Sequence, residues 1–142
     1  MTTSLMNTPN GVDLHIEAVA LARDVPGIAE EIASYAQTIG LDLQASFKLK
    51  ISIAEALNNI AGHGVDPEHP GIIKITCRRS ERVLEISIID TGRPIDTLPT
   101  GLFPLYDVEH GRGWPIMVSW IDQIEYQPGP PFNRLSLTKH LW

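Results

Sequence analysis

A single stretch, Ile51–Gly64 with the sequence ISIAEALNNIAGHG, constrains this chain more than any other. Successive steps of four residues advance only about 40° around an α-helix, so Glu55, Asn59 and His63 lie along one stripe of an otherwise apolar helix. Such a stripe is commonly the solvated side of an amphipathic helix. Asparagine, however, is a poor residue for a helix interior, and here Asn58 and Asn59 are adjacent. The stretch therefore indicates a long helix that carries a carboxylate, an amide and an imidazole into a site.

Length and composition favour one globular domain. The chain has 142 residues, of which 43% are hydrophobic and 20% charged, enough to bury a core without disulfides or a metal. We treat residues 1–142 as one domain and expect residues 1–11 to be flexible. The net charge of −6 argues against direct binding of nucleic acid, because phosphates are neutralised by clustered lysine and arginine.

Cysteine usage and hydropathy bear on the compartment. The single Cys77 cannot form an internal disulfide, and it lies in an alternating apolar segment typical of a core. No stretch approaches about 18 uninterrupted apolar residues, and the N-terminus lacks the basic start and apolar run of a signal peptide. The histidines outside the helix have no metal-ligand spacing, so we expect no zinc site. We expect a cytoplasmic protein that does not interact with a membrane.

Hydrophobic periodicity predicts a two-layer α/β sandwich, with a mixed, mostly antiparallel sheet covered on one face by about three helices. The first helix is expected after an Asp24 N-cap and should end at Gly40. The turn at residues 79–81 should join two strands as an antiparallel hairpin. The expected strands are 12–21, 72–78, 83–90, 124–126 and 132–141, and the expected helices are 25–39, about 44 to 62 or 64, and 114–121.

Two further motifs flank a long loop without periodicity. Asp90-Thr91-Gly92-Arg93-Pro94 follows the second hairpin strand, and Gly111-Arg112-Gly113 precedes the last expected helix. Each motif alone is ambiguous, because aspartate and glycine favour turns and two glycines can form a simple hinge. The two motifs and the polar helix, each beside the expected strand or helix, are hard to obtain together by chance.

In this order, Glu55-x3-Asn59-x3-His63-Gly64, Asp90 to Pro94 and Gly111 to Gly113 resemble the N, G1 and G2 boxes of the GHKL ATPases, the histidine-kinase-like Bergerat-fold group. The segments DVPGIAEEI, EALNNIAGHG, GRGWPIM and FNRLSLTKHL resemble its anti-sigma factor serine/threonine kinases. A chain of 142 residues has no room for a phosphoacceptor-histidine hairpin or a transducer domain, which favours this sub-family. Pro94 and Trp114-Pro115 depart from the usual pattern and bear on lid mobility and phosphate contacts.

The resemblance implies binding of ATP with Mg²⁺. An asparagine oxygen is a suitable magnesium ligand, which would be Asn59, and Glu55 one turn earlier would be the catalytic base that accepts the proton of the attacking hydroxyl. Asp90 would accept a hydrogen bond from the adenine amine, and the glycine-flanked turn with its helix N-terminus would approach the phosphates. The residues implied for nucleotide binding are Asn59, His63, Asp90, Gly92, Pro94, Gly111, Arg112, Gly113 and Asn133.

The partners implied by the resemblance are a STAS-type anti-anti-sigma factor, which would be phosphorylated on serine or threonine, and a sigma factor, which would be sequestered. A non-catalytic binding module switched by ATP is an alternative, although such a module has no need of Glu55. A kinase for a STAS partner that controls an output other than a sigma factor is a second alternative. The resemblance also allows a homodimer.

The loop Ile95–His110 is expected to act as a lid. Its prolines and glycine prevent a helix, so its order should depend on contacts to bound phosphates through the Gly111 to Gly113 turn.

Overall fold

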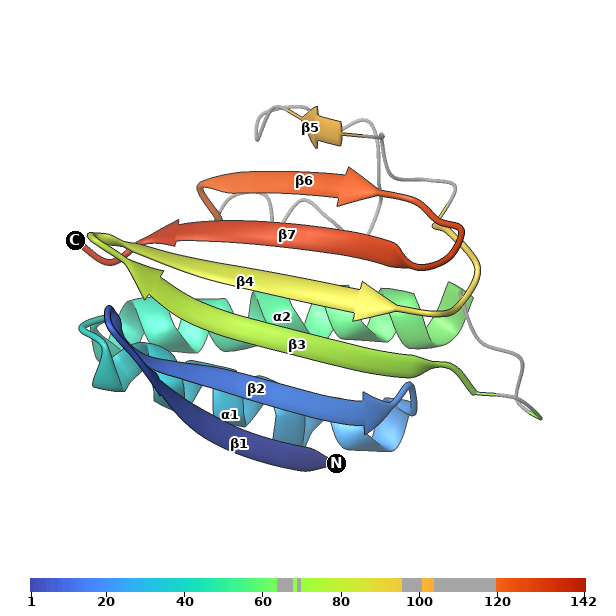
Figure 1. The fold of residues 1–142 in the computed structure, drawn as a ribbon, viewed down its shortest axis with the longest axis horizontal. Coiled ribbons are helices and arrows are strands. Elements are labelled where there is room, and N and C mark those ends of the chain that lie inside the picture. Colours follow the sequence, from blue (N-terminus) through green and yellow to red (C-terminus); the bar gives the residue numbers. More distant parts are fainter. Residues whose placement is uncertain (64–67, 69, 96–100, 104–119) are drawn as a thin grey trace.

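The computed structural model describes residues 1–63, 68, 70–95, 101–103 and 120–142. These residues form one seven-stranded sheet with the spatial order β1-β2-β3-β4-β7-β6-β5 (Figure 1). The strands are β1 Thr2–Thr8, β2 Gly11–Val19, β3 Ile72–Ser80, β4 Val83–Asp90, β5 Gly101–Phe103, β6 Gln123–Gln127 and β7 Asn133–His140. The predicted hairpin of β3 and β4 is confirmed.

The sheet is antiparallel at every pairing of the described strands, whereas a mixed, mostly antiparallel sheet was expected. The reason lies in the connection between β2 and β3, which contains two helices, α1 Val25–Thr38 and α2 Leu43–His63. One crossover helix returns the chain to the start of the preceding strand and makes the next strand parallel. A second helix takes the chain back to the end where β2 finished, so β3 runs antiparallel to β2 (Figure 1).

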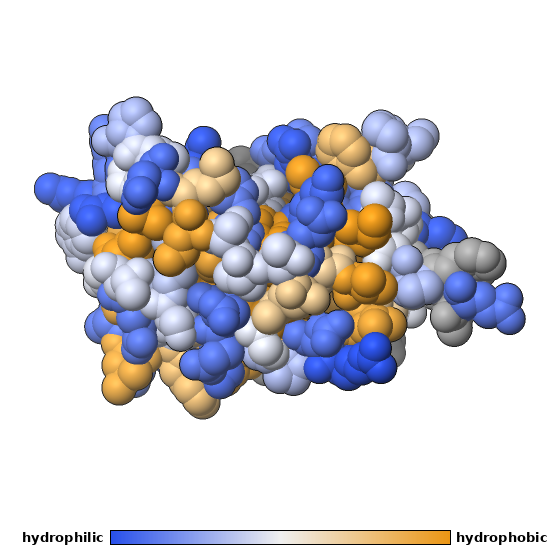
Figure 2. Space-filling view, turned by 60° about the horizontal axis from the view of Figure 1, so that its bottom comes forward, coloured by the Kyte–Doolittle hydropathy of each residue, from blue (hydrophilic) through white to orange (hydrophobic). Residues whose placement is uncertain are grey.

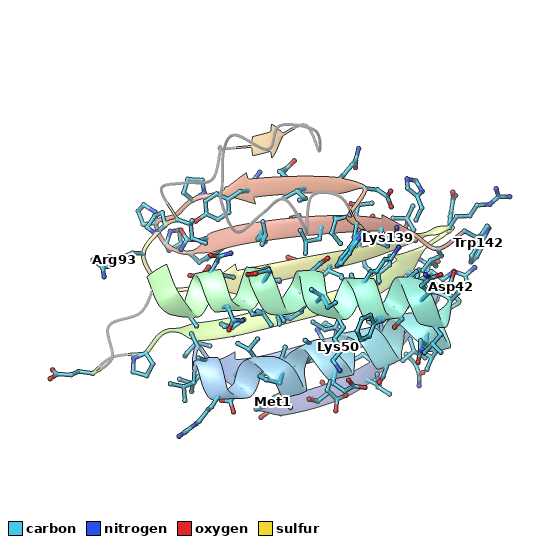
Figure 3. All side chains as sticks on the ribbon, turned by 180° about the vertical axis from the view of Figure 1, so that it is seen from behind. Met1, Asp42, Lys50, Arg93, Lys139 and Trp142 are labelled. Carbon is cyan, nitrogen blue, oxygen red and sulfur yellow. The ribbon has the colours of Figure 1, made fainter. Side chains whose placement is uncertain are left out.

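The two helices cover the same face of the sheet, as predicted for a two-layer sandwich (Figures 1 and 3). Side chains spaced four apart on each helix are buried against alternate residues of the central strands. Cys77 is one of these core residues, as predicted. Among the most deeply buried are Ile28, Ile32 and Ala36 of α1, Leu49, Ile53 and Leu57 of α2, and Ile75, Cys77, Leu84 and Ile88 of the sheet.

The helices begin and end close to the predicted residues, but the capping hydrogen bond is not formed by the predicted residue. Gly40 follows α1 with a φ of +120°, a conformation that favours glycine. Asp24 does precede α1, but its side chain makes no capping hydrogen bond. The cap forms instead on α2, where Oδ1 of Asp42 accepts a hydrogen bond from the Ala45 backbone N–H at 2.7 Å.

The N-terminal residues differ from the expected flexible segment. Residues Thr2–Thr8 form strand β1, which pairs with β2 over its whole length and lies at the edge of the sheet. The expected helix 114–121 lies outside the described residues except for its last two positions. In the part of the chain that the structure describes, neither the length nor the hydropathy of any helix is sufficient to cross a membrane.

Candidate functional site

The candidate site is built around Asp90, the last residue of β4. Asp90 lies opposite Ile73 of β3 and Asn133 of β7, because β4 is the central strand of the sheet. Only 5% of the surface of Asp90 is exposed. Its Oδ1 accepts hydrogen bonds from the Gly92 backbone N–H at 2.9 Å and from Nδ2 of Asn133 at 3.0 Å. Oδ2 accepts no hydrogen bond from any residue that the structure describes. One oxygen therefore holds the turn, and the other remains available to a ligand.

Asn133 fixes the position of this carboxylate. Its Nδ2 also donates to the Gly92 carbonyl at 2.9 Å, and its Oδ1 accepts from the Gly129 backbone N–H at 2.7 Å. Asn133 is 1% exposed, so its amide is fully engaged by protein atoms. The geometry favours a positioning role for Asn133 over the direct nucleotide contact expected from the resemblance.

Burial of Asp90 disfavours the ionised form of its carboxyl group. Burial raises the pKa of the Asp90 carboxyl above its ordinary value, and the hydrogen bonds from Asn133 and Gly92 oppose that rise. A buried carboxylate with an available oxygen is costly unless a donor pairs with it. The site is therefore suited to a ligand that brings an N–H or O–H donor to Oδ2.

Thr91 ties the turn after β4 to the start of β3, a contact that the sequence analysis missed. Its Oγ1 accepts from the Ile72 backbone N–H at 3.0 Å, and its own N–H donates to the Ile72 carbonyl at 3.3 Å. A Cβ atom at Gly71 would lie 3.0 Å from Thr91 Oγ1, so a side chain at Gly71 would disturb this junction. The turn is thus held on the β3 side by Thr91 and on the β7 side by Asn133.

A third contact fixes the chain beyond the motif. Ile95 is buried, and its backbone N–H donates to the Tyr126 hydroxyl of β6 at 2.9 Å. Pro94, between the turn and this anchor, is exposed. Residues 91–95 are therefore bound to the sheet at both ends, whereas 96–100 lie outside the described residues.

The polar stripe of α2 is present as predicted for Glu55 and Asn59. Both residues are half-buried, and Nδ2 of Asn59 donates to the Glu55 backbone carbonyl at 3.0 Å. This bond leaves the oxygen of the Asn59 amide as the atom available to a cation. The Glu55 carboxylate forms no hydrogen bond or ion pair with any described residue. The helix thus presents two oxygen-bearing groups one turn apart.

The stripe and the Asp90 turn lie toward the same end of the molecule. In Figure 1 the C-terminal end of α2 and the arrowhead of β4 point to the right, and in Figure 3 Arg93, which follows the turn, projects at that end. His63 is the last residue of α2, but its side chain is not described. Gly111, Arg112 and Gly113 lie outside the described residues, so the structure does not relate them to Asp90.

Comparison with known proteins gives a family match over most of the chain. The family model described as the histidine kinase-like ATPase domain matches residues 18–139. The chain is 33% identical over 99 residues to "Serine/threonine-protein kinase BtrW" of Bordetella bronchiseptica, covering 66% of this chain and 70% of that protein. It is 24% identical over 135 residues to "Anti-sigma F factor" of Bacillus subtilis, covering 91% and 92%.

The fold is similar to that of a solved structure. The crystal structure of the RsbU and RsbW domains of Rv1364c from Mycobacterium tuberculosis superposes with a TM-score of 0.66 at 18% identity. The match covers 94% of this chain and 32% of that chain, so this protein corresponds to about a third of it. At this identity the likeness concerns the fold alone, and it agrees with the predicted α/β sandwich.

Proposed function

The chain belongs to the histidine kinase-like ATPase domain family, the GHKL group, and from this premise we propose that it is an ATP-binding anti-sigma factor with protein serine/threonine kinase activity. In this proposal it phosphorylates a serine or threonine of a STAS-type anti-anti-sigma partner and sequesters a sigma factor. The names of two relatives support each half: one is a serine/threonine-protein kinase and the other an anti-sigma factor. We further propose that residues 1–142 act as one domain in the cytoplasm.

The observation that carries the proposal is the Asp90 carboxylate. Its Oδ1 is held by Gly92 and Asn133, while Oδ2 has no partner among the described residues. Adenine presents an exocyclic amine, which is a donor, where guanine presents a carbonyl oxygen, which is an acceptor. Asp90 therefore selects adenine, and Gly92 leaves space beside it for the ring.

Asn59 is the proposed magnesium ligand. The fit rests on its amide, whose nitrogen is bound to the Glu55 carbonyl so that its oxygen is the free atom. Magnesium takes one or two protein oxygens and completes its octahedron with phosphates and water. When bound, it neutralises charge that develops on the phosphates. Gly111, Arg112 and Gly113, together with His63, are proposed to hold the phosphates by backbone amides and by positive charge.

Glu55 is the proposed catalytic base. The hydroxyl oxygen of the partner's serine or threonine forms a bond to the γ-phosphorus, the bond from that phosphorus to the bridging oxygen breaks, and ADP leaves. The hydroxyl proton passes to the Glu55 carboxylate, which forms no hydrogen bond or ion pair with any described residue. A carboxylate at this position distinguishes the kinase from a module that only binds nucleotide.

Three experiments test the proposal. Calorimetric titration of the purified chain with ATP and Mg²⁺ should give saturable heat, and the absence of heat or thermal shift would rule out the nucleotide site. Transfer of labelled phosphate from ATP to candidate STAS proteins separates a kinase from an ATP-switched binding module. Proteins captured with and without ATP then identify the partner, and a STAS protein recovered without any sigma factor would point to a different regulatory output.

A further inference from the structure

The hairpin of β6 and β7 holds the segment that follows Asp90 at two points. At the start of β7, Nδ2 of Asn133 donates a hydrogen bond to the Gly92 carbonyl at 2.9 Å. Near the end of β6, the Tyr126 hydroxyl accepts a hydrogen bond from the Ile95 backbone N–H at 2.9 Å. Because β6 and β7 are paired with each other, this one hairpin fixes the positions of Gly92 and Ile95 relative to each other.

The contact between Tyr126 and Ile95 is buried. Tyr126 is 2% exposed and Ile95 is 5% exposed. A buried N–H group without an acceptor is costly, so the hydroxyl determines where Ile95 can lie. Pro94, which precedes Ile95, has no N–H group. The first backbone donor after Arg93 is therefore that of Ile95, and Tyr126 binds it.

Tyr126 also holds the chain through strand pairing. Gly101, the first residue of β5, is paired with Tyr126 in the antiparallel ladder. Residues 95 and 101 are therefore both positioned by the same residue of β6, the first through a side chain and the second through the strand. The chain that leaves Asp90 thus meets the sheet at Tyr126 on each side of residues 96–100.

We propose that Tyr126 is a positioning residue of the nucleotide site, because its hydroxyl keeps Gly92 in place beside the Asp90 carboxylate. The inference rests on the proposed adenine contact of Asp90. The Gly92 N–H donates to Oδ1 of Asp90 at 2.9 Å, and the hydrogen bond at Ile95, three positions later, limits how far that N–H can move. Without this bond, residues 92–95 gain freedom that a bound nucleotide must remove again, and such ordering lowers affinity.

Tyr126→Phe tests the proposal, because it removes the hydroxyl and keeps the ring. Calorimetric titration should give a dissociation constant for ATP about three- to tenfold higher than that of the unchanged chain, as expected for partial loss of one hydrogen bond. The rate of phosphate transfer at saturating ATP should stay within about twofold, because the hydroxyl contacts Ile95 and no reacting atom. A higher KM for ATP at constant kcat is therefore the expected result.

Tyr35→Phe is the matched control. Tyr35 of α1 is also a buried tyrosine, 5% exposed, and its hydroxyl donates to a backbone group, the Val12 carbonyl of β2, at 2.7 Å. β6 lies near the top of Figure 1, whereas α1 lies toward the bottom, the side that Figure 2 turns forward. Both variants should lower the melting temperature, and only Tyr126→Phe should weaken ATP binding. An equal loss of affinity in Tyr35→Phe would assign the effect to general destabilisation and overturn the proposal.

Amide exchange measured by NMR without nucleotide tests the hold on Gly92 directly. In the unchanged chain the Ile95 N–H should be protected like the amides of β6. In Tyr126→Phe, exchange at Ile95 and Gly92 should be at least about tenfold faster, and in Tyr35→Phe it should be unchanged there. Fast exchange at Ile95 in the unchanged chain would overturn the proposal, even if Tyr126→Phe does not fold. Unaltered exchange at Gly92 in a folded Tyr126→Phe would do the same.

The two binding titrations also separate this proposal from the proposed function. An unchanged chain that binds no ATP would refute the nucleotide site itself. Equal ATP affinity in the unchanged chain and in Tyr126→Phe would leave the nucleotide site intact and refute only the role of Tyr126. Circular dichroism of both variants establishes that they are folded.

Discussion

Asp90→Asn changes one functional atom and so isolates the proposed adenine contact. The Oδ1 of the new amide can keep both hydrogen bonds that Asp90 now accepts, from Gly92 and Asn133. The opposite orientation of the amide would place its nitrogen against two donors, so the orientation is determined. Nδ2 therefore replaces Oδ2, and the atom available to the ligand changes from acceptor to donor.

The expected loss of ATP affinity follows from this exchange. A hydrogen bond to a charged acceptor contributes about 1.5 to 3 kcal/mol, and leaving two donors facing each other adds a desolvation cost of about 1 to 3 kcal/mol. A total of about 2.5 to 6 kcal/mol corresponds to a dissociation constant roughly 10²- to 10⁴-fold higher. Guanine carries an acceptor at the corresponding position, so GTP should lose less affinity than ATP.

The free energy of unfolding of Asp90→Asn, unlike its ATP affinity, should not decrease at neutral pH. Because burial raises the folded-state pKa of Asp90, the unfolded chain loses this proton first as the pH rises. The folded state is therefore progressively destabilised between the unfolded and folded pKa values, and fully so above the folded one. A neutral amide lacks this penalty, so Asp90→Asn should be at least as stable as the parent at neutral pH. The difference should disappear below the unfolded pKa.

Calorimetric titration and thermal unfolding over a pH series measure both effects. Asp90→Ala is the control, because it loses both internal hydrogen bonds and should be destabilised by about 1 to 3 kcal/mol as well as fail to bind. Unchanged ATP affinity in Asp90→Asn would refute the adenine assignment. A loss of stability in Asp90→Asn as large as in Asp90→Ala would refute the inference that Oδ1 alone is used within the protein.

Four other outcomes are expected. Glu55→Gln should retain ATP binding and lower the rate of phosphate transfer to a STAS partner by about 10²- to 10⁴-fold, measured with labelled ATP. Asn59→Ala should remove the Mg²⁺ dependence of ATP binding, measured by titration with and without chelator, with little change in stability. ATP, but not ADP, should slow amide exchange across residues 95–110. Gly40→Ala should lower the free energy of unfolding by about 1 kcal/mol or more, because φ is +120° and its Cβ would lie 3.2 Å from the Trp142 ring.

The sequence predicts the parts of this molecule that depend on local pattern. The helix that carries Glu55 and Asn59 follows from apolar spacing over several turns, and the β3–β4 hairpin follows from two alternating runs around a short turn. These signals are repeated along each element, so single exceptions do not obscure them.

The sequence does not predict contacts between distant residues. The bond from Asn133 to Asp90 joins positions 43 apart, and only the alignment of β4 with β7 brings them together. Residues 1–11 were expected to be flexible, yet pairing with β2 orders Thr2–Thr8 as a strand. The antiparallel pairing of β2 and β3 likewise depends on the directions in which α1 and α2 run across the sheet. Hydrophobic periodicity does not predict these directions.

The position of Asp90 nevertheless has a signal in the local pattern. Along β4 the buried residues are Leu84, Ile86, Ile88 and Asp90, so the carboxylate occupies the next core position of an alternating strand. A shift of one residue in the pairing of β4 would turn Asp90 to the face of the sheet that the helices do not cover. The buried apolar residues of β4 would turn to that face as well, so burial of the core fixes the register. The same burial that holds this register raises the pKa of Asp90 and leaves one oxygen for a donor. A site of this kind can therefore be recognised before its structure is known. Its mark is a polar residue that continues the alternation of buried residues at the end of a central strand.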